Sequence, residues 1–324
     1  MDILSSIQSR LGAELAAMNE IIRRSLATDN PMMNAVVTNY LTTKGKQLRP
    51  IMVILSARFF GEVNDHVLHA GAALEMLHNA SLIHDDIVDE TDTRRGRRTI
   101  NSIWGNHIAV LVGDFFVSNA LSAGIRTGNI NIISSLSELG VELSLGEIDQ
   151  ICNVRDHNFD YESYMNMIRK KTASLFSNCV RMGAEAVGVP ASRYRDLLEY
   201  GEKLGLCFQI KDDIFDYFED ERVGKPTGND LREGKVTLPL LYALANGDPA
   251  TAQAYKEMLR RGNLSNDEIA ELIRFARESG GIEYAVARMR GIEADADHLL
   301  DAYPDSEWKQ TFRDLFDYII SRDH

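Results

Sequence analysis

The sequence predicts an all-α protein that forms one large helical bundle. For most of the 324 residues, apolar side chains recur three and four positions apart, which is the spacing of one helix face. Alternating apolar and polar runs, which are typical of strands, are scarce. Only seven prolines occur, and most of them lie where one helical pattern ends and another begins. No linker rich in Ser, Pro or Gly divides the chain, so we expect a single domain over residues 1–324.

The predicted helices follow from this spacing and from the residues that interrupt it. The turn at Thr42–Lys46 and the basic loop at Thr93–Arg98 separate helical patterns. Gly, Pro and charged residues accumulate from Gly224 to Gly234, as in a mobile lid loop. In chain order, the predicted helices are Leu4–Leu26, one starting at Asn30-Pro31, Pro50–Phe60, Asn64–Val88, Ile108–Ile125, Ile130–Val154, Tyr161–Val187, Arg193–Asp220, and several from Leu238 onward.

Composition excludes some classes of function. The net charge of −13 argues against a nucleic-acid-binding protein, which would show a basic surface. The three cysteines are widely spaced and form neither a zinc pattern nor a disulfide framework, so we expect buried thiols in a reducing compartment. No N-terminal signal segment is visible, and Gly113 and Asp114 interrupt the most apolar window, which is too polar to span a bilayer unaided. We expect a cytoplasmic protein without a transmembrane segment.

Two acidic motifs organise the chain. They are His84-Asp85-Asp86-Ile87-Val88-Asp89 and Lys211-Asp212-Asp213-Ile214-Phe215-Asp216. On a helix, residues four apart share a face, and like charges placed so repel each other. Magnesium prefers oxygen ligands and usually binds through one or two carboxylates together with substrate phosphates. One such motif is often a solvated helix face, but two beside apolar segments and basic loops predict a magnesium and diphosphate site.

Basic residues stand close to these motifs. Arg binds phosphate through two parallel hydrogen bonds, whereas Lys acts as a point charge. Any one of these residues could be a plain surface cation, and Arg97 and Arg98 are interpreted so. A lone histidine in an apolar helix is most often a core residue, which is our interpretation of His84, whereas His78 could donate to a phosphate. The candidates near the motifs and loops are Lys46, Arg49, Arg94, Arg95, Lys171, Lys225 and Lys235.

The order of the motifs resembles that of the trans-isoprenyl diphosphate synthases, and within them the bacterial long-chain polyprenyl synthases of the octaprenyl type. The resemblance runs from about Lys44 to Pro239 and implies an isoprenoid synthase bundle with a central apolar cavity. Two departures are a missing glycine before Gly45 and Gln47 in place of a common arginine. The motifs that carry the resemblance are Gly45-Lys46-Gln47-Leu48-Arg49-Pro50, Leu82-Ile83-His84-Asp85-Asp86-Ile87-Val88-Asp89, Arg94-Arg95-Gly96, Gly146-Glu147, Lys171-Thr172 and Phe208-Gln209-Ile210-Lys211-Asp212-Asp213-Ile214-Phe215-Asp216.

The resemblance also implies roles for single residues. Isopentenyl diphosphate would be held by Lys46, Arg49, His78 and Arg95. Magnesium carrying an allylic diphosphate would be bound by Asp85, Asp89, Asp212 and Asp216. The same diphosphate would contact Arg94, Lys171, Lys225 and Lys235. Thr172 and Gln209 would flank the developing allylic cation, which makes Asp85, Asp89, Lys171, Thr172, Gln209 and Asp212 the expected catalytic set. A homodimer is expected from the resemblance alone, and transient membrane contact would accompany release of so apolar a product.

Product length depends on small residues before the first motif. Ser81 lies one turn before Asp85 on the same helix face, so the spacing favours Ser81 as a lining residue. Ala80 takes a role only by resemblance, because a bulky aromatic at this position gives short products in the family. Leu136, Leu139 or Leu143 could form the floor of the channel.

The sequence leaves several alternatives to a long-chain synthase open. The closest is a short-chain farnesyl or geranylgeranyl synthase. A terpene cyclase would not need Lys46, Arg49 and Arg95, and a non-catalytic partner subunit would be expected to have a damaged aspartate motif.

Overall fold

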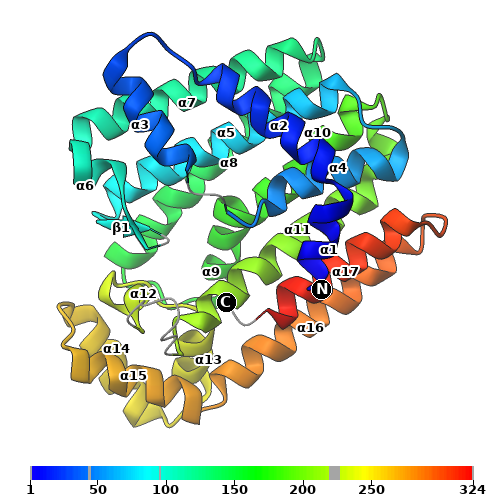
Figure 1. Cartoon of the computed structure of the whole chain (residues 1–324). Coiled ribbons are helices and arrows are strands. Elements are labelled where there is room, and N and C mark those ends of the chain that lie inside the picture. Colours follow the sequence, from blue (N-terminus) through cyan, green and yellow to red (C-terminus); the bar gives the residue numbers. More distant parts are fainter. Residues whose placement is uncertain (1, 43–44, 95, 219–226, 323–324) are drawn as a thin grey trace. The chain divides into compact units, whose positions relative to one another are not determined.

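The computed structural model describes residues 2–42, 45–94, 96–218 and 227–322. These residues are mostly helical, and one antiparallel hairpin pairs β1 (Thr93–Arg94) with β2 (Arg97–Arg98) (Figure 1). The predicted all-α class is therefore confirmed. The helices are α1 Ile3–Arg10, α2 Gly12–Ser25, α3 Pro31–Leu41, α4 Leu48–Phe60, α5 Asp65–Val88, α6 Ile100–Trp104, α7 Asn106–Arg126, α8 Ile130–Arg155, α9 Tyr161–Ile168, the π-helix η1 Arg169–Ala173, α10 Ser174–Ala186, α11 Ala191–Phe215, α12 Asn229–Arg232, α13 Leu238–Asn246, α14 Pro249–Arg261, α15 Asn266–Glu278, α16 Gly281–Leu300 and α17 Glu307–Ser321.

Capping residues set several helix boundaries where the sequence pattern places them. The side chain of Asn30 accepts a hydrogen bond from the Met33 N–H at the start of α3, and Pro31 takes the first helical position. Asn64 caps α5 in the same way through the Val67 N–H. Each cap satisfies a backbone donor that has no partner within the helix, so these starts are encoded locally.

Other boundaries differ from the prediction. The opening helix is two helices, because the backbone leaves the helical region at Leu11 (φ −100°, ψ 15°). The segment predicted as one helix from Tyr161 to Val187 contains the π-helix η1. The last helix before the predicted lid ends at Phe215, and α12 forms within the part of that lid which the structure describes. Residues 224–226 of the lid lie outside the described residues.

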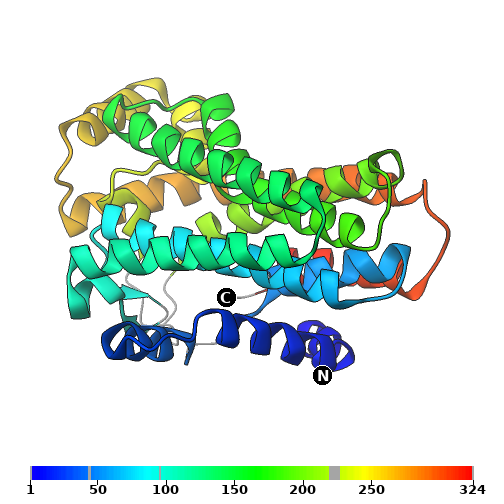
Figure 2. The same ribbon diagram turned by 90° about the horizontal axis from the view of Figure 1, so that it is seen from above.

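The first of two compact units comprises residues 1–141, 175–201 and 299–318. Helix α5 is its central element and packs against α2, α4, α6 and α7. Figures 1 and 2 show α5 and α7 side by side. Gly113 allows this approach, because a Cβ there would lie only 2.1 Å from Nε2 of His84. The first aspartate motif is thus held at the end of the best-packed helix of this unit.

The second unit comprises residues 142–174, 202–298 and 319–324. Helix α13 packs against α9, α14 and α15. The second aspartate motif at the end of α11 adjoins this core through Tyr217, which is one of its members. The buried residues of the core are Tyr217, Leu231, Leu240, Ala243, Leu244, Ala252, Leu259, Ile269, Leu272, Ile273 and Ala276. The expectation of a single domain stays a prediction.

Helix α7 is long and apolar enough to cross a membrane, with a mean hydropathy of 1.7 over its most apolar window. Among the described residues it is the one helix that meets this criterion. Ala109, Val112 and Phe116 on its inner side are buried, and the helix packs on α5. A core helix in a bundle has the same composition, so the predicted absence of a transmembrane segment stays a prediction.

Candidate functional site

The first aspartate motif forms the last turn of α5. Asp85 lies within the helix, and Asp89 is its C-terminal cap, whose N–H donates to the Asp85 carbonyl at 2.8 Å. The helical turn therefore extends to Asp89, and both carboxylates stand on one face, as predicted. Both side chains are partly exposed, whereas Asp86 is buried.

Asp86 has a different role from its neighbours. Its Oδ1 accepts a hydrogen bond from Nε of Arg94 at 2.6 Å. Burial raises the pKa of Asp86, and the Arg94 guanidinium lowers it only in part. The sequence assigned Arg94 to the allylic diphosphate, but in the structure this arginine pairs with Asp86. The Arg94 side chain remains 36% exposed, so part of the guanidinium is still accessible.

The basic residues predicted for isopentenyl diphosphate lie in the first unit. Arg49 stands in the first turn of α4, with its guanidinium 5.3 Å from the ring centre of Phe176. The ammonium of Lys46 lies 5.9 Å from the ring centre of Tyr318, and the Lys46 carbonyl accepts a hydrogen bond from Gln8. His78 is buried on α5. Arg95 lies outside the described residues.

The proposed channel residues are also on α5. Ala80 is buried, whereas Ser81 is partly exposed and its hydroxyl donates to the His78 carbonyl at 2.9 Å. The floor candidates Leu136 and Leu139 are buried in the core of the first unit. The roles of all four residues in product length stay predictions.

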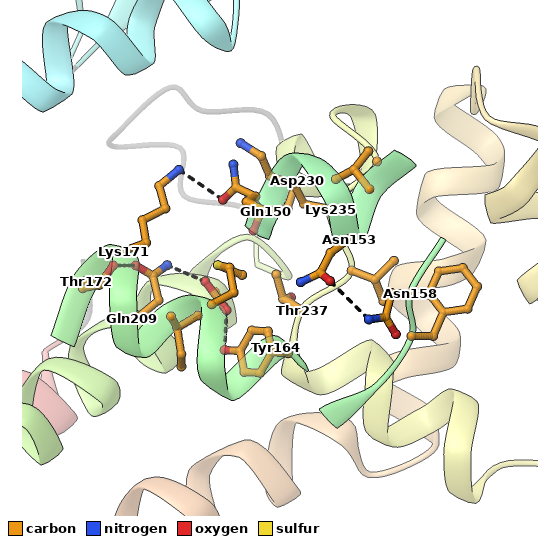
Figure 3. Close-up of a pocket in the computed structure, with 17 residues that line it drawn as sticks. Gln150, Asn153, Asn158, Tyr164, Lys171, Thr172, Gln209, Asp230, Lys235 and Thr237 are labelled. Carbon is orange, nitrogen blue, oxygen red and sulfur yellow. Dashed lines mark hydrogen bonds between the residues drawn. The ribbon is translucent and has the colours of Figure 1, made fainter. Parts of the chain in front are cut away.

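A cavity of about 180 Å³ lies in the second unit (Figure 3). It brings together Lys171, Thr172, Gln209 and Lys235, which the sequence assigned to the allylic substrate. The residues that line it are Gln150, Asn153, Val154, Asn158, Phe159, Tyr164, Met167, Ile168, Lys171, Thr172, Gln209, Asp213, Asp230, Gly234, Lys235, Val236 and Thr237.

Lys171 and Thr172 reach this cavity from the π-helix η1. Such a turn shifts the register of the following side chains and is frequent at functional sites. Gly146 of α8 lies so close to η1 that a Cβ there would be 2.6 Å from the backbone nitrogen of Lys171. Lys171 forms an ion pair with Glu147 and donates to Gln150 at 3.1 Å. Helix α8 therefore holds both the backbone and the ammonium of Lys171.

The second aspartate motif places its three carboxylates in different surroundings. Asp212 pairs with Arg322 at 2.5 Å. The two oxygens of Asp216 accept the N–H groups of Asn229 and Asp230, at 3.0 and 3.1 Å. Of the three, it is Asp213 that lines the cavity. Asp216 was predicted as a metal ligand, and here it caps the start of α12.

Asp213 is the most deeply buried carboxylate of this motif. Burial raises its pKa to about 7, although hydrogen bonds from Tyr164 and Gln209 favour the charged form. Asp230, which also lines the cavity, has a pKa raised by burial and by the charges of Asp213 and Asp216. Strongly shifted pKa values of this kind are common at functional sites.

Some residues of the site were missed in the sequence. Tyr164 had no signal, since a single tyrosine in a helical pattern is usually core. Gln150 could have been found, because it follows Glu147 by one helical turn. Arg322 lies far along the chain from Asp212.

Lys235 was predicted and lines the cavity, with its ammonium 2.5 Å from Glu233. Lys225 lies outside the described residues.

The carboxylates of the two aspartate motifs are the candidate metal ligands. Within the described parts of the chain, no group of three or more His, Cys, Asp or Glu side chains is placed to hold an ion. Asp85 and Asp89 still fit magnesium, because this ion commonly takes one or two carboxylates and completes its shell with phosphate and water. The predicted arrangement of the two motifs across an apolar channel stays a prediction, since they lie in different units.

Comparisons with known proteins show the family of this chain. The profile of the family described as polyprenyl synthetase matches residues 30–276. Octaprenyl diphosphate synthase of Escherichia coli (strain K12) is 34% identical over 322 residues, which cover 99% of each chain. A solved polyprenyl synthase from Caulobacter crescentus CB15, complexed with calcium and isoprenyl diphosphate, has a TM-score of 0.93 at 31% identity, over 99% of this chain and 98% of its own.

A third relative has a shorter product in its name. The geranylgeranyl pyrophosphate synthase of Bacteroides thetaiotaomicron is 39% identical, with a TM-score of 0.86, over 99% of this chain and 100% of its own. The family profile spans both aspartate motifs and every residue that the sequence assigned to the site. The chain therefore belongs to the polyprenyl synthetase family of prenyltransferases.

Proposed function

We propose that this protein is a magnesium-dependent trans-polyprenyl diphosphate synthase. It would condense isopentenyl diphosphate head to tail with an allylic diphosphate, and repeat the step to a medium or long all-trans product such as octaprenyl diphosphate. The observation that carries the proposal is the cavity of the second unit, where Lys171, Thr172, Gln209 and Lys235 converge. The names of relatives that make octaprenyl diphosphate support the product class.

The residues present suit an ionisation mechanism. The carbon–oxygen bond of the allylic diphosphate breaks when the negative charge of the leaving group is stabilised. Lys171 and Lys235 would supply fixed positive charge to that diphosphate. The oxygens of Thr172 and Gln209 would face the allylic cation. The double bond of isopentenyl diphosphate would attack this cation, and the released diphosphate would then take up the proton that is lost. Lys46, Arg49 and His78 would position that second substrate, with Arg95 as a further ligand.

Magnesium would be held by Asp85, Asp89, Asp212 and Asp216. Bound there, it would neutralise the diphosphate that leaves. The solved Caulobacter relative was complexed with calcium and isoprenyl diphosphate, which supports a divalent cation in this family. Activity with magnesium, and its loss on addition of a chelator, would test this assignment.

A homodimer is part of the proposal. Helix α7 presents Val110, Leu111, Leu121 and Ile125 to solvent, and Leu111 and Ile125 are 58% and 62% exposed. These residues share one face of α7 with the exposed Asp114 and Ser118, and a second copy could cover this face. Sedimentation of the wild type and of Leu111→Glu would test the dimer. A cytoplasmic location is proposed as well, and cell fractionation would test it.

A short-chain synthase is the second candidate. It is favoured by the geranylgeranyl pyrophosphate synthase that is 39% identical to this chain. The small side chains of Ala80 and Ser81 argue against a farnesyl product. One incubation decides between them: magnesium, labelled isopentenyl diphosphate and either a C10, C15 or C20 allylic primer, with products sized by chromatography. A ladder beyond C20 supports the long-chain synthase, whereas no incorporation with any primer would refute the proposed function.

A further inference from the structure

Three hydrogen bonds connect four side chains that line the cavity of the second unit. The Tyr164 hydroxyl donates to Oδ2 of Asp213 at 2.6 Å. Nε2 of Gln209 donates to Oδ1 of the same carboxylate at 2.7 Å. Oε1 of Gln209 accepts the hydroxyl of Thr172, also at 2.7 Å. Figure 3 shows this hydrogen-bond network, which runs from Tyr164 on α9 through residues of α11 to Thr172 on η1.

Three of the four side chains in this hydrogen-bond network are shielded from water, and Gln209 is partly exposed. Tyr164 is 3% exposed, Asp213 4% and Thr172 8%. In such surroundings a donor or acceptor that loses its partner cannot replace it with solvent, so the arrangement is strongly preferred. Tyr164 stands on α9, directly before the π-helix that carries Lys171 and Thr172.

The carboxylate decides how the Gln209 amide is turned. The two ends of an amide group have similar size, but one donates and the other accepts. Asp213 accepts at both oxygens, so it holds the NH₂ end of Gln209, and the amide oxygen turns to Thr172. The opposite orientation would bring two acceptor oxygens together. Because Thr172 donates its proton to Gln209, the lone pairs of its oxygen remain for a neighbouring positive charge.

We propose that Tyr164 is a positioning residue for prenyl transfer: its hydroxyl holds Asp213, and through it the Gln209 amide and the Thr172 hydroxyl, in the orientation that stabilises the allylic cation. The inference rests on the proposed function. Tyr164 contributes to the ionisation step through these partners, and a merely structural tyrosine would affect folding stability alone.

The first test compares Tyr164→Phe with Tyr200→Phe. Tyr200 is the matched control in the first unit, since it is 1% exposed and its hydroxyl donates to the Phe312 carbonyl at 2.7 Å. Both variants lose a buried hydrogen bond and should unfold at a lower temperature. Only Tyr164→Phe should lower kcat, by about 10- to 100-fold, because small misplacements of reacting groups have effects of this size. The KM for isopentenyl diphosphate should stay within about twofold of wild type.

A double-mutant cycle identifies the route. If Tyr164 acts through Gln209, then adding Tyr164→Phe to Gln209→Ala should lower kcat by less than about twofold. Effects of the two substitutions that multiply, or a wild-type kcat in Tyr164→Phe, would overturn the inference. The proposed function would still stand in either case, provided that the wild type catalyses prenyl transfer. A wild type without prenyl transfer would refute the proposed function itself. Should Tyr164→Phe fail to fold, the cycle of Asp213→Asn with Gln209→Ala tests the next link, from Asp213 to the Gln209 amide. Multiplicative effects there would overturn the inference, because Tyr164 is proposed to act through this link.

Discussion

Arg322 donates from Nη2 to Oδ1 of Asp212 at 2.5 Å, close to the C-terminal end of the described chain. Arg322 is 8% exposed, and its guanidinium lies 4.3 Å from the ring centre of Phe208. It also donates to the Phe208 carbonyl at 3.0 Å. A residue near the end of the chain therefore neutralises a carboxylate that is predicted to bind magnesium.

Replacing this arginine should change the magnesium requirement. In Arg322→Ala the Asp212 carboxylate loses a competing cation, so less magnesium should give half-maximal activity. A competing interaction of about 1 kcal/mol corresponds to roughly a fivefold shift. The variant should also lose about 1–3 kcal/mol in the free energy of unfolding, since a buried charged donor is removed. Arg290→Ala, which breaks the surface pair with Glu293, is the control. An increased magnesium requirement would contradict this account.

Asp85→Ala should nearly abolish turnover and leave the helical fold intact. The change removes a partly exposed carboxylate from the last turn of α5 and no core contact. We expect kcat to fall by at least about 100-fold, as for other losses of charge stabilisation at a reacting group. Circular dichroism and steady-state kinetics check the two statements. Asp65→Ala, at the opposite end of α5, should keep normal activity. Normal activity of Asp85→Ala would refute the metal assignment.

Gly146→Ala should damage both stability and activity. The added Cβ would lie 2.6 Å from the backbone nitrogen of Lys171, so η1 must shift and Thr172 moves with it. Overpacking of this kind lowers the free energy of unfolding by about 1–3 kcal/mol. The kcat should fall by about 10- to 100-fold, because small displacements of reacting groups have effects of this size. Gly140→Ala on the same helix has no atom within 4 Å of the new Cβ. It should gain up to about 1 kcal/mol, because alanine favours a helix over glycine. Equal effects of the two changes would argue against the close packing at Lys171.

Ala80→Phe should shorten the products without stopping catalysis. Ala80 is 1% exposed, so a phenyl ring must occupy space beside α5 and costs about 1–3 kcal/mol of stability. Chromatography of the products from labelled isopentenyl diphosphate measures the shift. Ser81→Ala removes volume and should give no shortening. An unchanged product ladder in Ala80→Phe would exclude Ala80 from the channel.

Thiol chemistry tests the environment of the cysteines. Burial raises the pKa of the Cys179 and Cys207 thiols, so both stay protonated at pH 8. Only a thiolate reacts with a disulfide reagent, so these two thiols should react slowly. Both side chains are fully buried, whereas Cys152 is partly exposed. In the folded protein at most one of the three thiols should react quickly, and all three should react in guanidinium. Two or more fast thiols in the folded state would contradict the burial.

Local patterns in the sequence determined the helical class and most of the candidate site. The apolar spacing, the Asn30 cap and the two aspartate motifs each involve residues within a few positions of one another, so they are legible in the chain itself. Lys171, Thr172 and Gln209 were assigned by resemblance, and the structure brings them into one cavity.

Only the tertiary structure decided how these side chains are partnered. It paired Arg94 with Asp86, turned Asp216 towards the start of α12, joined Tyr164 to Asp213, and set Arg322 on Asp212. One of these contacts joins residues 110 positions apart and another joins residues 49 positions apart. All four are buried or partly buried, which limits water as an alternative partner. Helix periodicity repeats every few residues and carries no record of such neighbours, so these roles could not be predicted from spacing alone.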